Sequence, residues 1–130
     1  MKERIERLCK KYVELELECD GLSRVLSYVL ERDGGLVYGK DYVVRSGILD
    51  SEFGEVPTHF WIEFNGSKHG GMILDYRARM WLGDREEVPN GFFDPKEYKK
   101  VEYIPMRLLL SNTHVIVFNT LIKKWDYYEG

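Results

Sequence analysis

Three side chains in the sequence, Cys19, His59 and Asp75, have the chemistry that covalent catalysis by a thiol requires. The thiolate is the nucleophilic form of cysteine, and the unpaired N–H groups and dipole of a helix N-terminus lower the pKa of a thiol placed there. An imidazole must reach the sulfur as a general base or as the cation of an ion pair, and a carboxylate must orient the ring. The sequence thus offers Cys19 as nucleophile, His59 as acid/base and Asp75 as orienting group.

Two helices are predicted near Cys19. Apolar residues recur at steps of three and four from Glu3 to about Glu18, which indicates an amphipathic helix. The pattern restarts at Leu22 and stops at Asp33-Gly34-Gly35, a strong helix terminator. We therefore expect the second helix to begin very near Cys19, with the thiol at its N-terminus.

The residues around His59 and Asp75 have the composition of strands. Residues 42–48 and 59–64 are rich in β-branched and aromatic side chains, and the apolar run 71–76 contains Asp75 near its end. Asn65-Gly66 marks a tight turn, so the segments 59–64 and 71–76 are predicted to form an antiparallel hairpin. His59 and Asp75 would then face each other across the sheet.

The remaining segments complete a single α+β domain over residues 1–130. Residues 83–98 are rich in turn residues and predict a loop, with a helical turn after Asp94. Residues 101–110 favour another strand, and Ser111 is a candidate cap for a final helix. Trp61 alternates with its neighbours along a strand, and we expect it in the core.

Four short segments carry a family resemblance in this order: Cys19-Asp20-Gly21-Leu22-Ser23, Val43-Val44-Arg45-Ser46-Gly47, His59-Phe60-Trp61-Ile62-Glu63 and Ile73-Leu74-Asp75. They resemble the transglutaminase-like superfamily, whose nucleophile opens a helix, whose H-x-W-x-E pattern begins a strand and whose triad Asp ends the next strand. The resemblance covers about Glu18 to Arg77. It implies a papain-like fold, with N-terminal helices packed on an antiparallel sheet, and a thioester intermediate that water or an amine resolves.

The chain departs from that family at two points. Family members often follow the triad Asp with Pro-Thr, whereas this chain has Tyr76-Arg77. The sequence also contains no Gln, the side chain that papain-like enzymes commonly use in the oxyanion hole. The hole would need the Cys19 backbone N–H and a second donor, for which Tyr12 and a Trp are both open candidates.

Other reactive or charged side chains near these motifs have simpler interpretations. Cys9 lies in the middle of a predicted helix, where no helix end lowers its pKa, and is expected to be structural. His69 and His114 have no predicted cysteine or carboxylate partner. The arginines near the predicted site are expected to be surface charge, with binding of a substrate carboxylate as the alternative: Arg77, Arg79 and Arg85. The acidic strip before the nucleophile is expected to be solvated, with a preference for basic substrates as the alternative: Glu14, Glu16, Glu18 and Asp20.

Composition restricts the partners. The formal net charge of -3 gives no field to attract nucleic acid, and no apolar run approaches the roughly 20 residues that span a bilayer. Met1-Lys2-Glu3-Arg4 begins a charged helix rather than a signal peptide, so we expect a cytoplasmic protein that contacts neither nucleic acid nor membrane. The two Cys and three His lack zinc-site spacings, and no metal or organic cofactor is expected.

These observations predict a cysteine hydrolase or acyltransferase that acts on amide or isopeptide bonds of a peptide or protein substrate. The bond type follows from the resemblance. The alternative is a binding or assembly module that keeps the fold without turnover, and a cell-wall amidase is disfavoured because it would require export. The substrate and the oligomeric state stay open.

Overall fold

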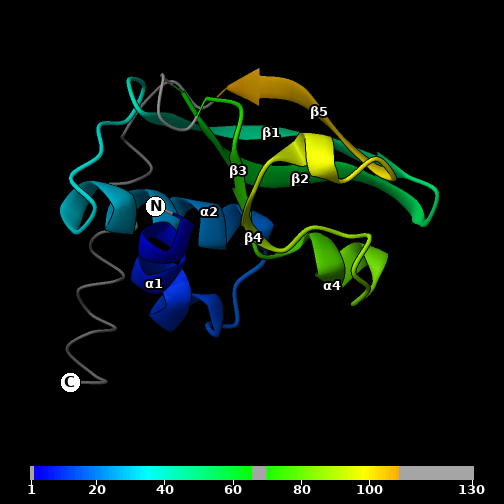
Figure 1. Cartoon of the computed structure of the whole chain (residues 1–130), viewed down its shortest axis with the longest axis horizontal. Helices are drawn as coiled ribbons and strands as arrows, with labels where there is room; N and C mark the ends of the chain where they lie inside the picture. Colours follow the sequence, from blue (N-terminus) through cyan, green and yellow to red (C-terminus); the bar gives the residue numbers. More distant parts are fainter. Residues whose placement is uncertain (1, 66–69, 109–130) are drawn as a thin grey trace.

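The computed structural model describes residues 2–65 and 70–108 and is a mixed α+β structure (Figure 1). Within these residues there are three α-helices, one 3-10 turn and a five-stranded antiparallel sheet. Their bounds, in chain order, are α1 Lys2–Val13, α2 Cys19–Arg32, β1 Tyr42–Ser51, β2 Gly54–Phe64, β3 Ile73–Asp75, α4 Ala78–Leu82, β4 Gly91–Phe93, η1 Pro95–Glu97 and β5 Val101–Leu108.

The sheet has the strand order β4-β3-β2-β1-β5, and each neighbouring pair is antiparallel. The long hairpin β1–β2 forms its centre, with Val44 opposite Ile62 and Gly47 opposite His59. β3 pairs with β2 only at two positions, Leu74 with Ile62 and Ile73 with Glu63, which confirms the predicted antiparallel pairing. His59 therefore lies beyond the paired part of β2 and β3.

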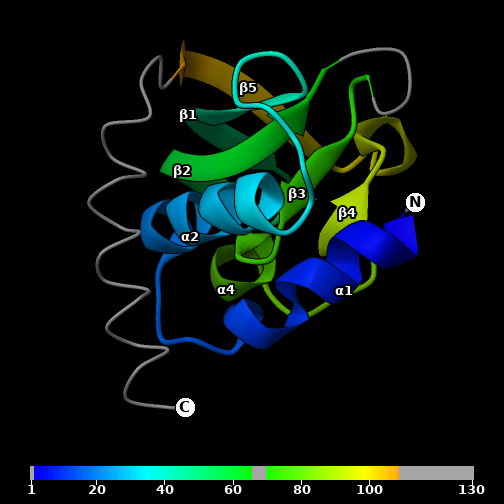
Figure 2. The same ribbon diagram turned by 90° about the vertical axis from the view of Figure 1, so that its left-hand side faces the viewer.

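Helices α1 and α2 lie on the same side of the sheet, and Figure 2 shows α2 across it. The main core joins the apolar stripe of α2 to alternate residues of three strands, because successive strand side chains point to opposite faces. Its fully buried members include Val29 and Leu30 of α2, Val44 of β1, Ile62 of β2 and Leu74 of β3. This packing fixes the direction of α2, whose first residue is Cys19.

Several predicted boundaries are confirmed. The second helix begins at Cys19, the strand at Val101 is present, and Asp94 caps the short 3-10 turn by accepting the Lys96 backbone N–H. Trp61 is 1% exposed, as expected of a core residue. The predicted final helix from Ser111 lies outside the described residues, as do Gly66, His69 and His114.

Other boundaries are corrected. The first helix ends at Val13 rather than near Glu18, and the carbonyls of Val13 and Leu15 bond to a distant arginine instead of to helical N–H groups. The strand that contains His59 begins at Gly54, so His59 lies within it rather than at its start. The predicted loop 83–98 contains β4, whose three buried residues complete the edge of the sheet against β3. No helix among the described residues is long and apolar enough to cross a membrane.

Candidate active site

Cys19 is the first residue of α2, and the local backbone explains why the helix begins there. Glu18 precedes it in an extended conformation, with φ -74 and ψ 177, and its carbonyl accepts the first helical hydrogen bond from Leu22 N–H at 2.9 Å. The Glu18 side chain makes no capping hydrogen bond to the first turn. The Cys19 side chain therefore lies beside a helix N-terminus that its own cap residue leaves uncapped.

His59 and Asp75 form a buried pair. The Nε2 atom of His59 and the Oδ2 atom of Asp75 are 2.7 Å apart, and the two side chains are 0% and 2% exposed. With Nε2–H donated to the carboxylate, the other ring nitrogen, Nδ1, is left for the reacting group. Nδ1 is buried, and no described atom meets hydrogen-bond geometry with it.

The pKa of His59 reflects these neighbours. Burial by itself lowers the pKa, but the charge and hydrogen bond of Asp75, together with interactions from Cys19, raise it to about 10. The contribution of Cys19 places the thiol close to the ring, although the thiol is not aligned as a hydrogen-bond partner of Nδ1. The structure thus brings together Cys19, His59 and Asp75, with His59 favoured as imidazolium at neutral pH.

Two further groups hold the Asp75 carboxylate. The Tyr103 hydroxyl donates to Oδ2 at 2.7 Å, and the Arg77 backbone N–H donates to Oδ1 at 2.9 Å. Both groups disfavour rotation of the carboxylate away from His59. Burial and the Asp75 charge raise the pKa of Tyr103, so this phenol stays a donor.

Sequence reasoning missed Tyr103, because it lies on β5, three strands away from β3 in the sheet. Its hydroxyl nevertheless bonds to Asp75 Oδ2. The Tyr103 ring packs edge-on against Trp61 at a centroid distance of 5.0 Å, and Trp61 stacks on His59 at 6.2 Å. Trp61 therefore supports the imidazole from behind rather than filling the main core under α2.

Gly47 leaves the space that Trp61 occupies. A Cβ atom at this position would lie 2.1 Å from the Ile104 carbonyl oxygen and 2.8 Å from the Trp61 ring. Any larger residue would push apart β5 and the ring that supports His59. The glycine in the Arg45-Ser46-Gly47 segment is thus required by close packing.

The candidate arginines are bound to the protein itself. Arg77 donates to backbone carbonyls near Cys19, Arg79 donates to the Val88 carbonyl at 2.9 Å, and Arg85 stacks over Phe53 at 4.2 Å. The expectation that Arg77 is a plain surface charge is wrong, because its guanidinium is half-buried among carbonyl oxygens.

Tyr12 is excluded as an oxyanion donor. Its hydroxyl accepts a hydrogen bond at 2.9 Å from Arg32, the last residue of α2, whereas Cys19 is the first. At 1.5 Å per residue the two ends of this helix are about 20 Å apart. The second donor must therefore come from elsewhere.

Cys9 is buried and unsuited to nucleophilic chemistry. It is 0% exposed, and burial together with the charge of Glu6 raises its pKa to about 12. A thiol with these properties stays protonated at neutral pH. Both cysteines are free thiols, which leaves Cys19 as the candidate nucleophile.

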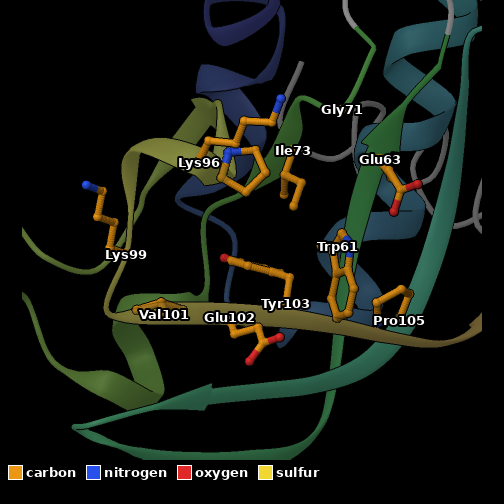
Figure 3. Close-up of a pocket in the computed structure, with 11 residues that line it drawn as sticks. Trp61, Glu63, Gly71, Ile73, Lys96, Lys99, Val101, Glu102, Tyr103 and Pro105 are labelled. Carbon is orange, nitrogen blue, oxygen red and sulfur yellow. The ribbon is translucent and has the colours of Figure 1, made fainter.

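A separate cavity of about 480 Å³ lies on the sheet face opposite α2 (Figure 3). Its walls include Trp61 and Ile73 from the sheet, Lys96 and Lys99 from the segment around η1, and Tyr103 from β5. Because the Tyr103 hydroxyl reaches Asp75, this cavity adjoins the His59–Asp75 pair from behind.

Among the described residues, no group of three or more His, Cys, Asp or Glu side chains is arranged to hold a metal ion. No family model, curated protein or solved structure matches the chain. The resemblance to the transglutaminase-like superfamily therefore depends on the sequence motifs alone.

Proposed function

We propose that this chain is a papain-like cysteine hydrolase or acyltransferase of the transglutaminase-like type, acting on an amide or isopeptide bond. The observation that carries the proposal is the buried 2.7 Å bond between His59 and Asp75, with Cys19 next to the histidine at the start of α2. The three residues come from separate segments of the chain, and each has the side chain that its role requires.

In this mechanism the Cys19 thiolate attacks the carbonyl carbon of the substrate and forms a C–S bond. The electron pair of the carbonyl moves to its oxygen, and in this proposal the N–H groups of the first turn of α2 stabilise the negative charge there. The His59 imidazolium then gives its proton to the leaving amine, the C–N bond breaks, and a thioester remains. Water or a second amine, deprotonated by His59, attacks the thioester and releases Cys19.

The first test is alkylation of the two cysteines by iodoacetamide, followed at each cysteine by peptide mass spectrometry between pH 5 and 9. We expect Cys19 to react at neutral pH, and we expect His59→Ala to slow its reaction by about tenfold or more, because the cation of the ion pair is lost. Cys9 is the internal control, since it should stay protected in both proteins. A slow reaction at Cys19 that does not depend on His59 would contradict the proposed function.

A binding or assembly module is the second candidate, and the burial of the site favours it. His59 is 0% and Cys19 is 8% exposed, so a substrate carbonyl must displace part of the surface to reach the thiol. Such a module would bind a peptide or protein without turnover. Cys19→Ala should then leave binding and cellular function intact, whereas it should abolish the function of an enzyme.

A further inference from the structure

Arg77 makes an unusual set of contacts for a single side chain. Its Nε–H donates to the Leu17 carbonyl at 2.8 Å, and its Nη2 donates to the carbonyls of Val13 at 2.7 Å and Leu15 at 3.0 Å. Its Nη1 donates to the Tyr76 carbonyl at 3.2 Å. The guanidinium therefore bonds to the carbonyl of the last residue of α1 and to two alternate carbonyls of the segment 14–18 that joins α1 to α2.

The carbonyl of Leu15 also accepts the Leu17 N–H at 2.8 Å, whereas no backbone N–H of the described residues bonds to the carbonyls of Val13 and Leu17, which Arg77 binds. The last carbonyls of a helix have no intrahelical partner, and the connection 14–18 is too short and irregular to satisfy them by itself. A planar guanidinium has five N–H donors in a fixed fork, so one arginine can bond to several carbonyls at once. A lysine ammonium cannot reproduce that fork.

The same residue also contacts the other half of the site. The Arg77 backbone N–H donates to Asp75 Oδ1 at 2.9 Å. Burial lowers the pKa of Arg77, while the charges of Asp75 and Cys19 raise it, which places the guanidinium close to both. Arg77 is thus the link between the candidate triad carboxylate and the segment that ends at the candidate nucleophile.

We propose that Arg77 is the positioning residue of this site, and that its guanidinium fixes the 14–18 connection so that Cys19 is held beside the His59–Asp75 pair. This inference rests on the proposed function of Cys19. It explains a departure from the family pattern, since Arg77 stands where family members often have Thr after the triad Asp and Pro. It acts through Cys19 and Asp75 and does not itself react.

The position of the connection also shapes the surface next to the nucleophile. A cavity of about 390 Å³ is bordered by residues 15–18, Tyr76, Arg77 and Met80. The segment that Arg77 holds lines this cavity, and so does the half-exposed Met80. Release of the segment would change this cavity and the place of Cys19 together.

The test compares Arg77→Met and Arg77→Lys with a matched control, Arg79→Met. Arg79 is also half-buried and also donates to a backbone carbonyl, but its partners, the Val88 carbonyl and the Asp84 carboxylate, do not belong to the connection. Two quantities are measured for each protein. They are the rate of Cys19 alkylation as a function of pH and the hydrogen–deuterium exchange of residues 14–18.

We expect Arg77→Met to slow Cys19 alkylation at pH 7 by about tenfold and to shift its pH profile upward, because both the fixed position and the nearby cation are lost. Arg77→Lys keeps the cation and should restore part of the rate, while residues 14–18 still exchange faster than in the unmodified protein. Arg79→Met should change the rate by less than about twofold. Cys9 should stay protected in every variant.

Three outcomes would overturn the inference. If Arg77→Met leaves both the Cys19 rate and the exchange unchanged while His59→Ala still slows Cys19, Arg77 does not position the site although the proposed function survives. If Arg77→Lys makes Cys9 as well as Cys19 accessible to alkylation, Arg77 stabilises the fold as a whole rather than positioning Cys19. If Cys19 of the unmodified protein does not depend on His59, the proposed function itself fails, and the role of Arg77 at a nucleophile fails with it.

Discussion

The pH dependence of stability gives a quantitative test of the buried His59–Asp75 pair. The pKa of His59 in the folded protein is raised to about 10, whereas an imidazole in an unfolded chain titrates near its ordinary value of about 6.5. Between these values the folded state holds one more proton than the unfolded state. The contribution of the pair is therefore fully present below pH 6.5 and is lost as the pH rises toward 10.

The expected change in the free energy of unfolding follows from the one extra proton that His59 holds in the folded state. The free energy of unfolding should fall with a slope of up to about 1.4 kcal/mol per pH unit, which amounts to at most about 2 kcal/mol between pH 6.5 and 8.5. The fall is smaller where Cys19 is removed, because Cys19 also raises the pKa of His59. The side chains of His59 and Asp75 are 0% and 2% exposed, so solvent screens this interaction little. The window stops at pH 8.5 because Cys9 and the tyrosines titrate above it in the unfolded chain.

The assay is urea unfolding at several pH values, carried out in a Cys19→Ala background. Removing the thiol matters because a Cys19 that ionises on folding would release the proton that His59 takes up and would hide the effect. The control is the same background with His59→Gln, which keeps a polar side chain of similar size without a titrating group. The difference in slope between the two proteins isolates His59, since their other titrating groups are shared. Equal slopes in the two proteins would refute the assignment of a charged, Asp75-bound His59.

Three other predictions concern the packing around the site. Tyr103→Phe removes one hydrogen-bond donor from the Asp75 carboxylate and should lower the free energy of unfolding by about 1.5–3 kcal/mol in urea titrations. An unchanged unfolding midpoint would mean that this hydrogen bond does not contribute to stability. Gly47→Ala should lower the free energy of unfolding by about 1–3 kcal/mol, because the added Cβ would lie 2.1 Å from the Ile104 carbonyl oxygen. An unchanged free energy of unfolding would show that β5 shifts away from the added Cβ without cost. Cys9 should be alkylated only when the protein unfolds, so its rate should rise with urea in step with unfolding, and rapid reaction in the native protein would contradict its burial.

The sequence was informative wherever a local pattern decides the structure. The apolar stripe that restarts after Cys19 and the terminator at Asp33-Gly34-Gly35 were enough to place α2, because a helix buries one face at a period of 3.6 residues. The β-branched and aromatic runs located the strands of His59 and Asp75, and their antiparallel pairing followed from the turn between them. The order of the three candidate site residues was therefore visible in the chain itself.

The local sequence pattern did not predict those features of the fold that depend on a residue far away in the chain. The apolar repeat continues through Leu15, yet α1 ends at Val13, where the carbonyls of Val13 and Leu15 bond to Arg77, more than 60 residues away. β4 is only three residues long, and it exists because β3 offers it an edge. Neither contact leaves a periodic signal in the sequence.

The sequence by itself determined which residues could react and which elements carry them, because side-chain chemistry and hydrophobic period are local properties. Only the tertiary structure decided how those residues are held. The hydroxyl of Tyr103 on β5 bonds to Asp75 on β3, and the Arg77 guanidinium bonds to the connection that leads to Cys19. Such contacts depend on where whole elements pack, and packing is a property of the assembled chain rather than of any segment of it.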